Sequence, residues 1–247
     1  MNRLLLDLGN SRLKWRFCEQ RSAGPMQAQA WPADARIEFP IAAAPHVAVG
    51  VSVAGRAART TLERLLRSTF PELPAPYWLR PSEHWGTLRC GYHEPALLGP
   101  DRWAALVGAH ALLARGPYAV LSIGTAITLD LVDATGRHIS GGIAPGRRLL
   151  RLVLREATGG IGAAEDHACR RRAAGPMDTA AAVAAGVDAA LHGTCARFAQ
   201  IASHRLGPEA PLLVTGGGAA AWAPLLGGRA IDDLVLQGVA RLHDGQP

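Results

Sequence analysis

LLLDLGNSRLKWRF, residues 4–17, is the stretch that decides the fold. Its apolar run over 4–8 and the alternation of polar and apolar residues over 11–17 predict two strands joined by a tight turn. The turn offers Gly9 for close approach, donors on Asn10 and Ser11, and the Asp7 carboxylate to hold hydrated Mg²⁺, which together suit a phosphate group. An unliganded hairpin turn uses the same residue types, so this motif alone leaves both interpretations open.

The same order of features returns later in the chain. Residues 119–123 and 126–132 predict two strands around a Gly124-Thr125 turn. This repetition indicates an internal duplication, with an N-terminal α/β domain over 1–116 and a C-terminal α/β domain over 117–247.

Glycine-rich segments also follow other predicted strands. A strand over 137–140 leads through GGIAPG, residues 141–146, into an arginine-rich helix. A short strand over 212–214 runs into TGGG, residues 215–218, where the backbone can approach a ligand closely. Turns of this kind at the ends of several strands favour a nucleotide site between two related domains.

The remaining pattern fills in the two domains. We expect irregular structure and short strands in the segment 23–45, which is rich in proline and alanine. Apolar periodicity predicts the other elements: a strand over 47–53, and helices over 55–68, from Asp101 to the Gly116-Pro117 stop, 177–190, 196–205 and 232–242.

The composition is that of a folded protein, with 247 residues of which 49% are hydrophobic and 19% charged. No apolar run reaches the ~18 residues of a membrane span, and the N-terminal residues show no secretory signal, so we expect a cytoplasmic protein with no membrane partner. No CxxC pair occurs, which favours reduced thiols over a disulfide framework or a zinc site for the four cysteines, Cys18, Cys90, Cys169 and Cys195.

The formal charge of +6 indicates an anionic partner, either nucleic acid or a phosphorylated small molecule. Lys14 is the only lysine and lies outside any GxxxxGK[ST] segment, which excludes a P-loop enzyme. Arg147, Arg151 and Arg155 share one helical face, and RRR follows at 170–172, so a nucleic-acid-binding or regulatory protein is an alternative. We favour a solvated surface over nucleic-acid binding, because no helix-turn-helix, zinc finger or aromatic-studded sheet accompanies these arginines.

Residues 91–102, GYHEPALLGPDR, place a carboxylate at a predicted helix start. Asp101 beside Arg102 suits a general base that accepts a hydroxyl proton while the arginine handles negative charge. An N-cap aspartate followed by a surface arginine gives the same pattern and is the competing interpretation.

Together these motifs resemble the type III pantothenate kinases. The resemblance spans residues 7–217, and the 91–102 block is its most specific part. It implies the duplicated two-domain α/β fold of actin, the heat-shock ATPases and the sugar kinases, which is ribonuclease H-like. It also implies ATP-dependent phosphorylation of pantothenate at its terminal hydroxyl, the first committed step of coenzyme A synthesis. The matching motifs are Asp7-x-Gly9-Asn10-Ser11, Gly91-Tyr92-x-x-Pro95-x-x-Leu98-Gly99-x-Asp101-Arg102, Gly124-Thr125-Ala126-x-Thr128-x-Asp130, Gly141-Gly142-x-x-Pro145-Gly146, Thr179 and Thr215-Gly216-Gly217.

The resemblance implies a role for each matched residue. Asp101 is the expected general base, and Mg²⁺ is expected near Asp7, with Asp130 as a second candidate ligand. A homodimer is implied, with the pantothenate pocket near the subunit interface. The expected ATP-phosphate contacts are Asp7, Leu8, Gly9, Asn10, Ser11, Arg12, Leu13, Lys14 and Thr125, and the expected pantothenate contacts are Tyr92, Gly99, Pro100, Asp101, Arg102 and Thr179.

One position departs from the family pattern. The family carries an aspartate two residues before its Gly-Thr-Ala, where it holds a monovalent cation, whereas this chain has Ser122. A hydroxyl is a poorer cation ligand than a carboxylate, so we expect activation by K⁺ or NH₄⁺ to be reduced.

Other functions are compatible with the same fold. One alternative is another small-molecule kinase or a phosphatase, from which the 91–102 block separates this chain. The other is a family member that has lost its activity, against which the carboxylates of Asp7, Asp101 and Asp130 argue.

Overall fold

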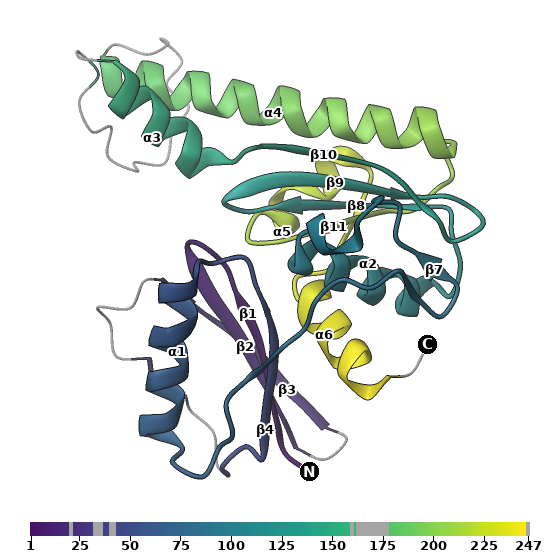
Figure 1. Ribbon diagram of the computed structural model, residues 1–247. Helices are drawn as coiled ribbons and strands as arrows, with labels where there is room; N and C mark the ends of the chain where they lie inside the picture. Colours follow the sequence, from purple (N-terminus) through teal and green to yellow (C-terminus); the bar gives the residue numbers. More distant parts are fainter. Residues whose placement is uncertain (20–21, 32–36, 40–42, 159–160, 162–177, 246–247) are drawn as a thin grey trace. The chain divides into compact units, whose positions relative to one another are not determined.

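The computed structural model describes residues 1–19, 22–31, 37–39, 43–158, 161 and 178–245 (Figure 1). Contacts within the chain divide the protein into two compact units. The first unit comprises 1–117, 132–140 and 233–247, and the second comprises 118–131 and 141–232. Both units are discontinuous in sequence, unlike the expected domains 1–116 and 117–247.

The first unit contains a five-stranded sheet in which the predicted hairpin is confirmed. β1 pairs antiparallel with β2 and parallel with β4. β3 is one of the strands expected in the segment 23–45, and it runs for nine residues because pairing with β2 supplies its hydrogen bonds. The sheet order is β3-β2-β1-β4-β5, formed by β1 (Arg3–Leu8), β2 (Arg12–Glu19), β3 (Ser22–Ala30), β4 (Val47–Ser52) and β5 (Tyr77–Trp78).

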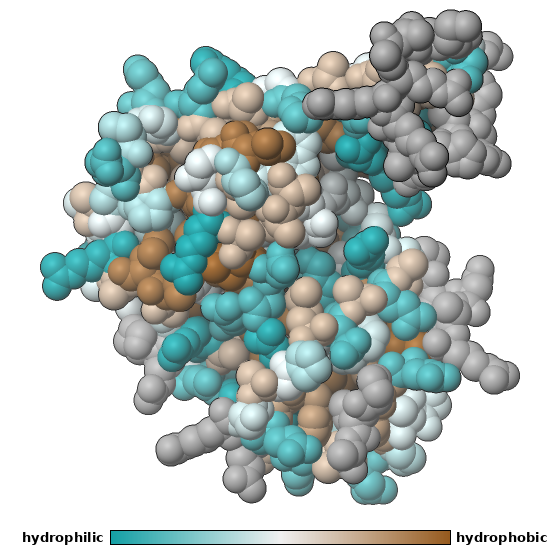
Figure 2. Space-filling model, turned by 180° about the vertical axis from the view of Figure 1, so that it is seen from behind, coloured by the Kyte–Doolittle hydropathy of each residue, from teal (hydrophilic) through white to brown (hydrophobic). Residues whose placement is uncertain are grey.

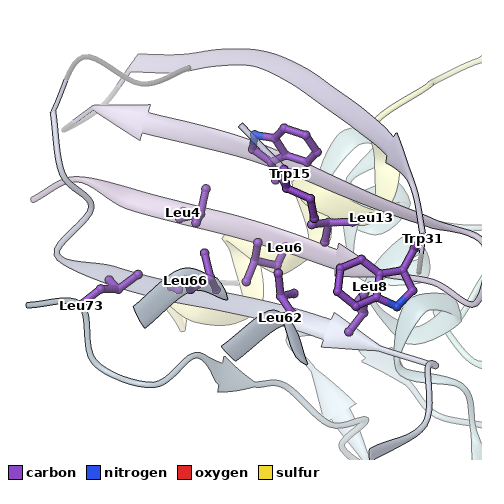
Figure 3. Packing of buried hydrophobic residues seen from close by; sticks show 11 residues of the cluster. Leu4, Leu6, Leu8, Leu13, Trp15, Trp31, Leu62, Leu66 and Leu73 are labelled. Carbon is purple, nitrogen blue, oxygen red and sulfur yellow. The ribbon is translucent and has the colours of Figure 1, made fainter. Parts of the chain in front are cut away.

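Both faces of β1 are buried, which explains its continuous apolar run. Alternate residues of a strand point to opposite faces, so the run supplies two hydrophobic clusters. One cluster lies under α1 (Arg56–Thr69) and is shown in Figure 3; it includes Leu4, Leu6, Leu8, Leu13, Trp15, Trp31, Leu62, Leu66 and Leu73. The other joins the sheet to α2 (Pro100–Leu113) and α6 (Leu234–Asp244) through Leu5, Val49, Val51, Ala104, Leu236 and Val239.

α2 and α6 approach each other closely at two glycines. A Cβ atom on Gly238 would lie 1.7 Å from the carbonyl oxygen of Ala104, and a Cβ on Gly108 would lie 2.4 Å from that of Leu234. At these two positions of the crossing only glycine fits, because any Cβ atom would collide with the backbone of the other helix. The crossing holds the closing helix in the first unit, although we expected that helix in the C-terminal domain.

The second unit repeats the strand order of the first. Its sheet has the order β10-β9-β8-β11-β12, which corresponds strand for strand to β3-β2-β1-β4-β5. β8 pairs parallel with β11, as β1 does with β4. This correspondence supports the predicted duplication. The strands are β8 (Tyr118–Ile123), β9 (Ala126–Val132), β10 (His138–Pro145), β11 (Leu212–Thr215) and β12 (Arg229–Ala230), and the helices are α3 (Arg147–Ala157), α4 (Thr179–Leu206) and α5 (Ala219–Trp222).

α4 is one continuous helix, in which the two expected helical segments, 177–190 and 196–205, run on into each other. Every fourth residue from Val183 to Cys195 is buried, and this stripe continues through Leu191 without interruption. β10 also runs on to Pro145, beyond its predicted end at residue 140. The expected start of the helix α4 at residue 177 and the arginines at 170–172 lie outside the described residues.

Short elements complete the described chain. They are the two-stranded sheet of β6 (His84–Trp85) and β7 (Leu88–Arg89), and the 3-10 turns η1 (Pro95–Leu97) and η2 (Pro224–Leu226). In the described ranges, no helix combines the length and hydropathy that a membrane-crossing segment needs.

Candidate active site

The first candidate feature is a carboxylate and a lysine at the tip of the β1–β2 hairpin. Asp7 and Lys14 face each other across the two strands, with the Lys14 Nζ atom 3.6 Å from Asp7 Oδ2. The turn between them is closed by the Gly9 amide, which donates to the Arg12 carbonyl at 3.0 Å. Asp7 is only 8% exposed, so the hairpin presents a largely desolvated charge pair.

The electrostatic surroundings of Asp7 connect it to the start of α2. The pKa of the Asp7 carboxyl is raised to about 6, mainly by burial. Lys14 opposes this rise, and the charge of Asp101 adds to it. In the fold of the first unit, the Asp101 carboxylate is therefore close enough to act electrostatically on Asp7, although the two residues are distant in sequence. Two carboxylates and one ammonium leave this cluster with a surplus of negative charge when all are ionised, which suits a divalent cation.

Asp101 lies in the first turn of α2, where the helix dipole favours negative charge. Its Oδ1 atom accepts a hydrogen bond from the Arg102 amide at 2.8 Å. The N-cap residue is Gly99, with Pro100 as the first helical residue, so the interpretation of Asp101 as the N-cap is wrong. Proline at the first helical position needs no hydrogen-bond partner for its nitrogen, which is why the helix begins one residue earlier than expected.

Arg102 is buried rather than displayed at the surface, contrary to the competing interpretation. Its Nη1 atom donates to the Tyr92 hydroxyl at 2.9 Å, and its Cζ atom lies 5.7 Å from the centre of the tyrosine ring. The 91–102 block thus folds back on itself, so that residues from its two ends are in contact. Tyr92 is half-buried and leaves part of its ring at the surface.

In the second unit, two further glycine segments approach the turn between β8 and β9, which itself contains Gly124. The Gly146 amide donates to the Thr125 carbonyl at 3.0 Å, and a Cβ on Gly146 would lie 2.2 Å from the Gly124 oxygen. Gly216 has a φ of +92°, and a Cβ there would lie 2.5 Å from the Ile123 oxygen. The predicted glycine-rich turns at 124–125, 141–146 and 215–218 therefore form one backbone-lined cluster in this unit, whereas the Asp7 turn belongs to the first unit.

The other predicted site residues of the second unit are dispersed. Asp130 is buried in β9; the burial of Tyr118 raises the pKa of that tyrosine, and the charge of Asp130 raises it further. Ser122 is half-buried on β8, in register with Thr215 of β11. Thr179 is the exposed first residue of α4, behind the N-cap Asp178, whose side chain accepts a hydrogen bond from the Ala181 amide at 2.7 Å.

The arginine face of α3 is partly used within the second unit. Arg147 forms an ion pair with Asp188 of α4. The apolar side of α3 packs through Leu150 and Leu154 onto the core of the same unit. These contacts give the helix a structural role that needs no nucleic acid.

Sequence reasoning missed two buried histidines of the first unit. His110 of α2 lies 2.8 Å, Nε2 to Oγ1, from Thr87, and burial lowers its pKa. His138, the first residue of β10, stacks on the ring of Tyr92. Neither residue belongs to a motif, and in β10 the isoleucines Ile139 and Ile143 are exposed while His138 is buried, so the apolar pattern of the strand gave no signal for His138.

The repeated sheet order and these clusters define a protein built from two related α/β units, which is the kind of fold that the family resemblance implies. Residues 3–201 match the model of the type III pantothenate kinase family. The chain belongs to that family.

Individual relatives agree over almost the whole length. The chain is 36% identical over 245 residues to a type III pantothenate kinase of Azoarcus sp. strain BH72, covering 96% of this chain and 89% of the relative. It is 35% identical over 256 residues to that of Stenotrophomonas maltophilia strain R551-3, covering 100% and 99%. A solved structure from Campylobacter jejuni, described as a Baf family transcriptional activator, has a TM-score of 0.56 at 18% identity, covering 98% and 97%, and this likeness concerns the fold alone.

Proposed function

We propose that this chain transfers the γ-phosphoryl group of ATP to the terminal hydroxyl of pantothenate, the first committed step of coenzyme A synthesis. The single observation that carries the proposal is the cluster of Asp7, Asp101, Arg102 and Tyr92 in the first unit of a family member. A phosphotransferase needs a carboxylate that accepts the proton of the acceptor hydroxyl and a positive charge for the phosphates, and this cluster contains both.

Asp101 is the proposed general base. It accepts the hydroxyl proton of pantothenate while the hydroxyl oxygen bonds to the γ-phosphorus and the bond from phosphorus to the ADP oxygen breaks. Its place in the first turn of α2 supports this role, because one oxygen is held by the Arg102 amide and the carboxylate is fixed beside Arg102. Tyr92, Gly99, Pro100, Arg102 and Thr179 are the proposed pantothenate contacts.

The hairpin turn from Asp7 to Lys14, with Thr125, is the proposed site of the ATP phosphates. The Gly9 turn offers backbone donors, and Lys14 supplies the only lysine charge of the chain.

Mg²⁺ is the proposed divalent cation. The residues present fit such an ion, because Asp7 is a desolvated carboxylate whose ionised form gains from a neighbouring cation, and carboxylate oxygen is the ligand type that Mg²⁺ prefers. Asp7 would hold it, with Asp130 as a second candidate. When bound, the ion neutralises charge on the transferring phosphates.

A homodimer and a cytoplasmic location belong to the same proposal. The family resemblance supports the dimer, and the free thiols of Cys18, Cys90 and Cys195 among the described residues are compatible with a reducing compartment. The ion pair between Arg147 and Asp188 weakens the nucleic-acid alternative, because it occupies one arginine of the proposed basic face.

The decisive variant is Asp101→Asn, which keeps the shape of the side chain and removes the base. We expect kcat for ADP release from Mg-ATP and pantothenate to fall by about 10²- to 10⁴-fold. Thermal denaturation should show the variant folded, because the first turn of α2 keeps its glycine cap and proline start. Wild-type turnover by the variant would show that Asp101 is not the base.

A further inference from the structure

We propose that His138 is a positioning residue for the acceptor substrate: it supports the ring of Tyr92 from within the protein and thereby fixes Arg102 beside Asp101. This inference rests on the proposed function, because it assigns Tyr92 and Arg102 to the pantothenate site.

The contact between the two rings is the first observation. The ring centres of His138 and Tyr92 lie 5.9 Å apart and the ring planes differ by 12°, which is an offset-stacked arrangement. His138 is 2% exposed, whereas Tyr92 is half-buried. The histidine is thus the buried support, and the tyrosine is the surface that a ligand can meet.

The backbone around the stack is fixed independently of the rings. A Cβ on Gly91 would lie 1.7 Å from the His138 carbonyl oxygen, so the chain just before Tyr92 lies directly on the first residue of β10. Two positions earlier, the Arg89 amide donates to the Gly136 carbonyl at 2.9 Å. Segments 89–92 and 136–138 are therefore pinned side by side, and the place of Tyr92 is set by that strand.

The position of Tyr92 in turn determines where the side chain of Arg102, at the start of α2, is held. Its hydroxyl accepts a hydrogen bond from Arg102 Nη1 at 2.9 Å, and the Arg102 amide donates to Asp101 Oδ1 at 2.8 Å. A shift of the Tyr92 ring would move the guanidinium that bonds to it. His138 itself is buried away from solvent and acts through Tyr92, so it is a positioning residue and not a catalytic one.

The test compares His138→Ala, which removes the support, with His138→Phe, which retains a flat ring of similar extent. KM and kcat are measured separately for pantothenate and for ATP by ADP release. We expect His138→Ala to raise KM for pantothenate about five- to tenfold, as loss of one aromatic pair would, while KM for ATP stays within about twofold. His138→Phe should restore KM for pantothenate to within about twofold of wild type.

His110→Ala is the matched control, because His110 is also buried in the same unit and its ring packs edge-on against Trp85. It should lower the melting temperature without a selective rise in KM for pantothenate. Should His138→Ala fail to fold, His138→Leu provides the second variant, since it fills the buried space without a ring that stacks on Tyr92 and should raise the same KM.

The outcomes separate the two proposals. Wild type without pantothenate-dependent ADP release would overturn the proposed function and, with it, this inference. Normal wild-type turnover with KM for pantothenate unchanged in His138→Ala, or raised no more than in His110→Ala at equal loss of melting temperature, would overturn the inference alone. A rise that His138→Phe does not reverse would also count against a stacking role.

Discussion

Arg102 shows how burial changes the meaning of a residue that a motif alone can only suggest. The sequence predicts an arginine beside a helix-starting aspartate, and both a catalytic pair and a surface pair fit that pattern. In the structure, Arg102 is 7% exposed and bonded to Tyr92. A buried guanidinium is costly unless its hydrogen bonds are met, so the burial of Arg102 excludes the solvated surface arginine of the competing interpretation.

Ser122 carries the prediction on monovalent cations. The half-buried hydroxyl on β8 offers one neutral oxygen where the family pattern has a carboxylate. We expect the wild-type rate to change less than about threefold when K⁺ and NH₄⁺ are replaced by tetramethylammonium, because a neutral ligand set binds a cation weakly.

The matched variant is Ser122→Asp, which restores the carboxylate. It should make the rate depend on K⁺, and the same salt substitution should then lower it markedly. A wild-type rate that collapses in tetramethylammonium would contradict the account of Ser122.

The site residues differ in how far the sequence could predict them. Asp7, Asp101 and the glycine turns could be found because each stands at a strand or helix end within a short motif. The support of Tyr92 by His138 could not, because the two residues belong to segments that only the tertiary fold brings together. Residue type gave no signal either, since a lone histidine on an alternating strand is ordinarily a core residue.

At the scale of single elements, the crossing of α2 and α6 allows a prediction with opposite signs for two helical glycines. Gly238→Ala places a methyl group 1.7 Å from the Ala104 oxygen and should destabilise the protein by about 1–3 kcal/mol or more, since overpacking must separate the helices. Gly193→Ala, in α4, meets no atom within 4 Å and should stabilise it by about 0.5–1 kcal/mol through helix propensity. Chemical denaturation of both variants measures the two effects; equal stabilities would refute the close crossing.

His110 gives a pH dependence to the contact between α2 and Thr87. Burial lowers the pKa of His110 below its ordinary 6.5, so the unfolded chain binds this proton more tightly than the folded protein does. The stability that neutral His110 provides is therefore present above pH 6.5 and is lost as the pH falls through 6.5 towards the lowered value.

The measurement is the melting temperature of wild type and His110→Gln between pH 7.5 and pH 5. The wild type should lose more melting temperature over this interval than the variant, because glutamine does not titrate. Parallel curves for the two proteins would show that His110 titrates normally.

The elements also show where pattern reasoning stops. The hairpin of β1 and β2 was predictable because its strands alternate or are continuously apolar. The bounds of β3 were not predictable, although short strands were expected in its segment, because an edge strand with few apolar residues takes its structure from its neighbour. The expected continuation of α4 from one alanine-rich segment into the next follows a buried stripe of every fourth residue.

At the scale of the whole molecule, the repeated strand order is the main structural result. The sequence already suggested duplication, because the order of strand, small-residue turn and strand occurs twice. The sequence did not indicate that α6 belongs to the first unit, since the apolar pattern of an amphipathic helix does not specify which sheet the helix packs against. The tight glycine crossing with α2 decides that assignment.

The central claim is that this chain phosphorylates pantothenate, and the most direct measurement is the identification of the product. Purified protein is incubated with Mg-ATP and pantothenate, and the products are analysed by mass spectrometry and ³¹P NMR. The account predicts one phosphomonoester on the terminal hydroxyl of pantothenate, formed in a one-to-one ratio with ADP and strongly reduced in Asp101→Asn. ADP formed without phosphorylated pantothenate, or no ADP at all from folded protein, would contradict it.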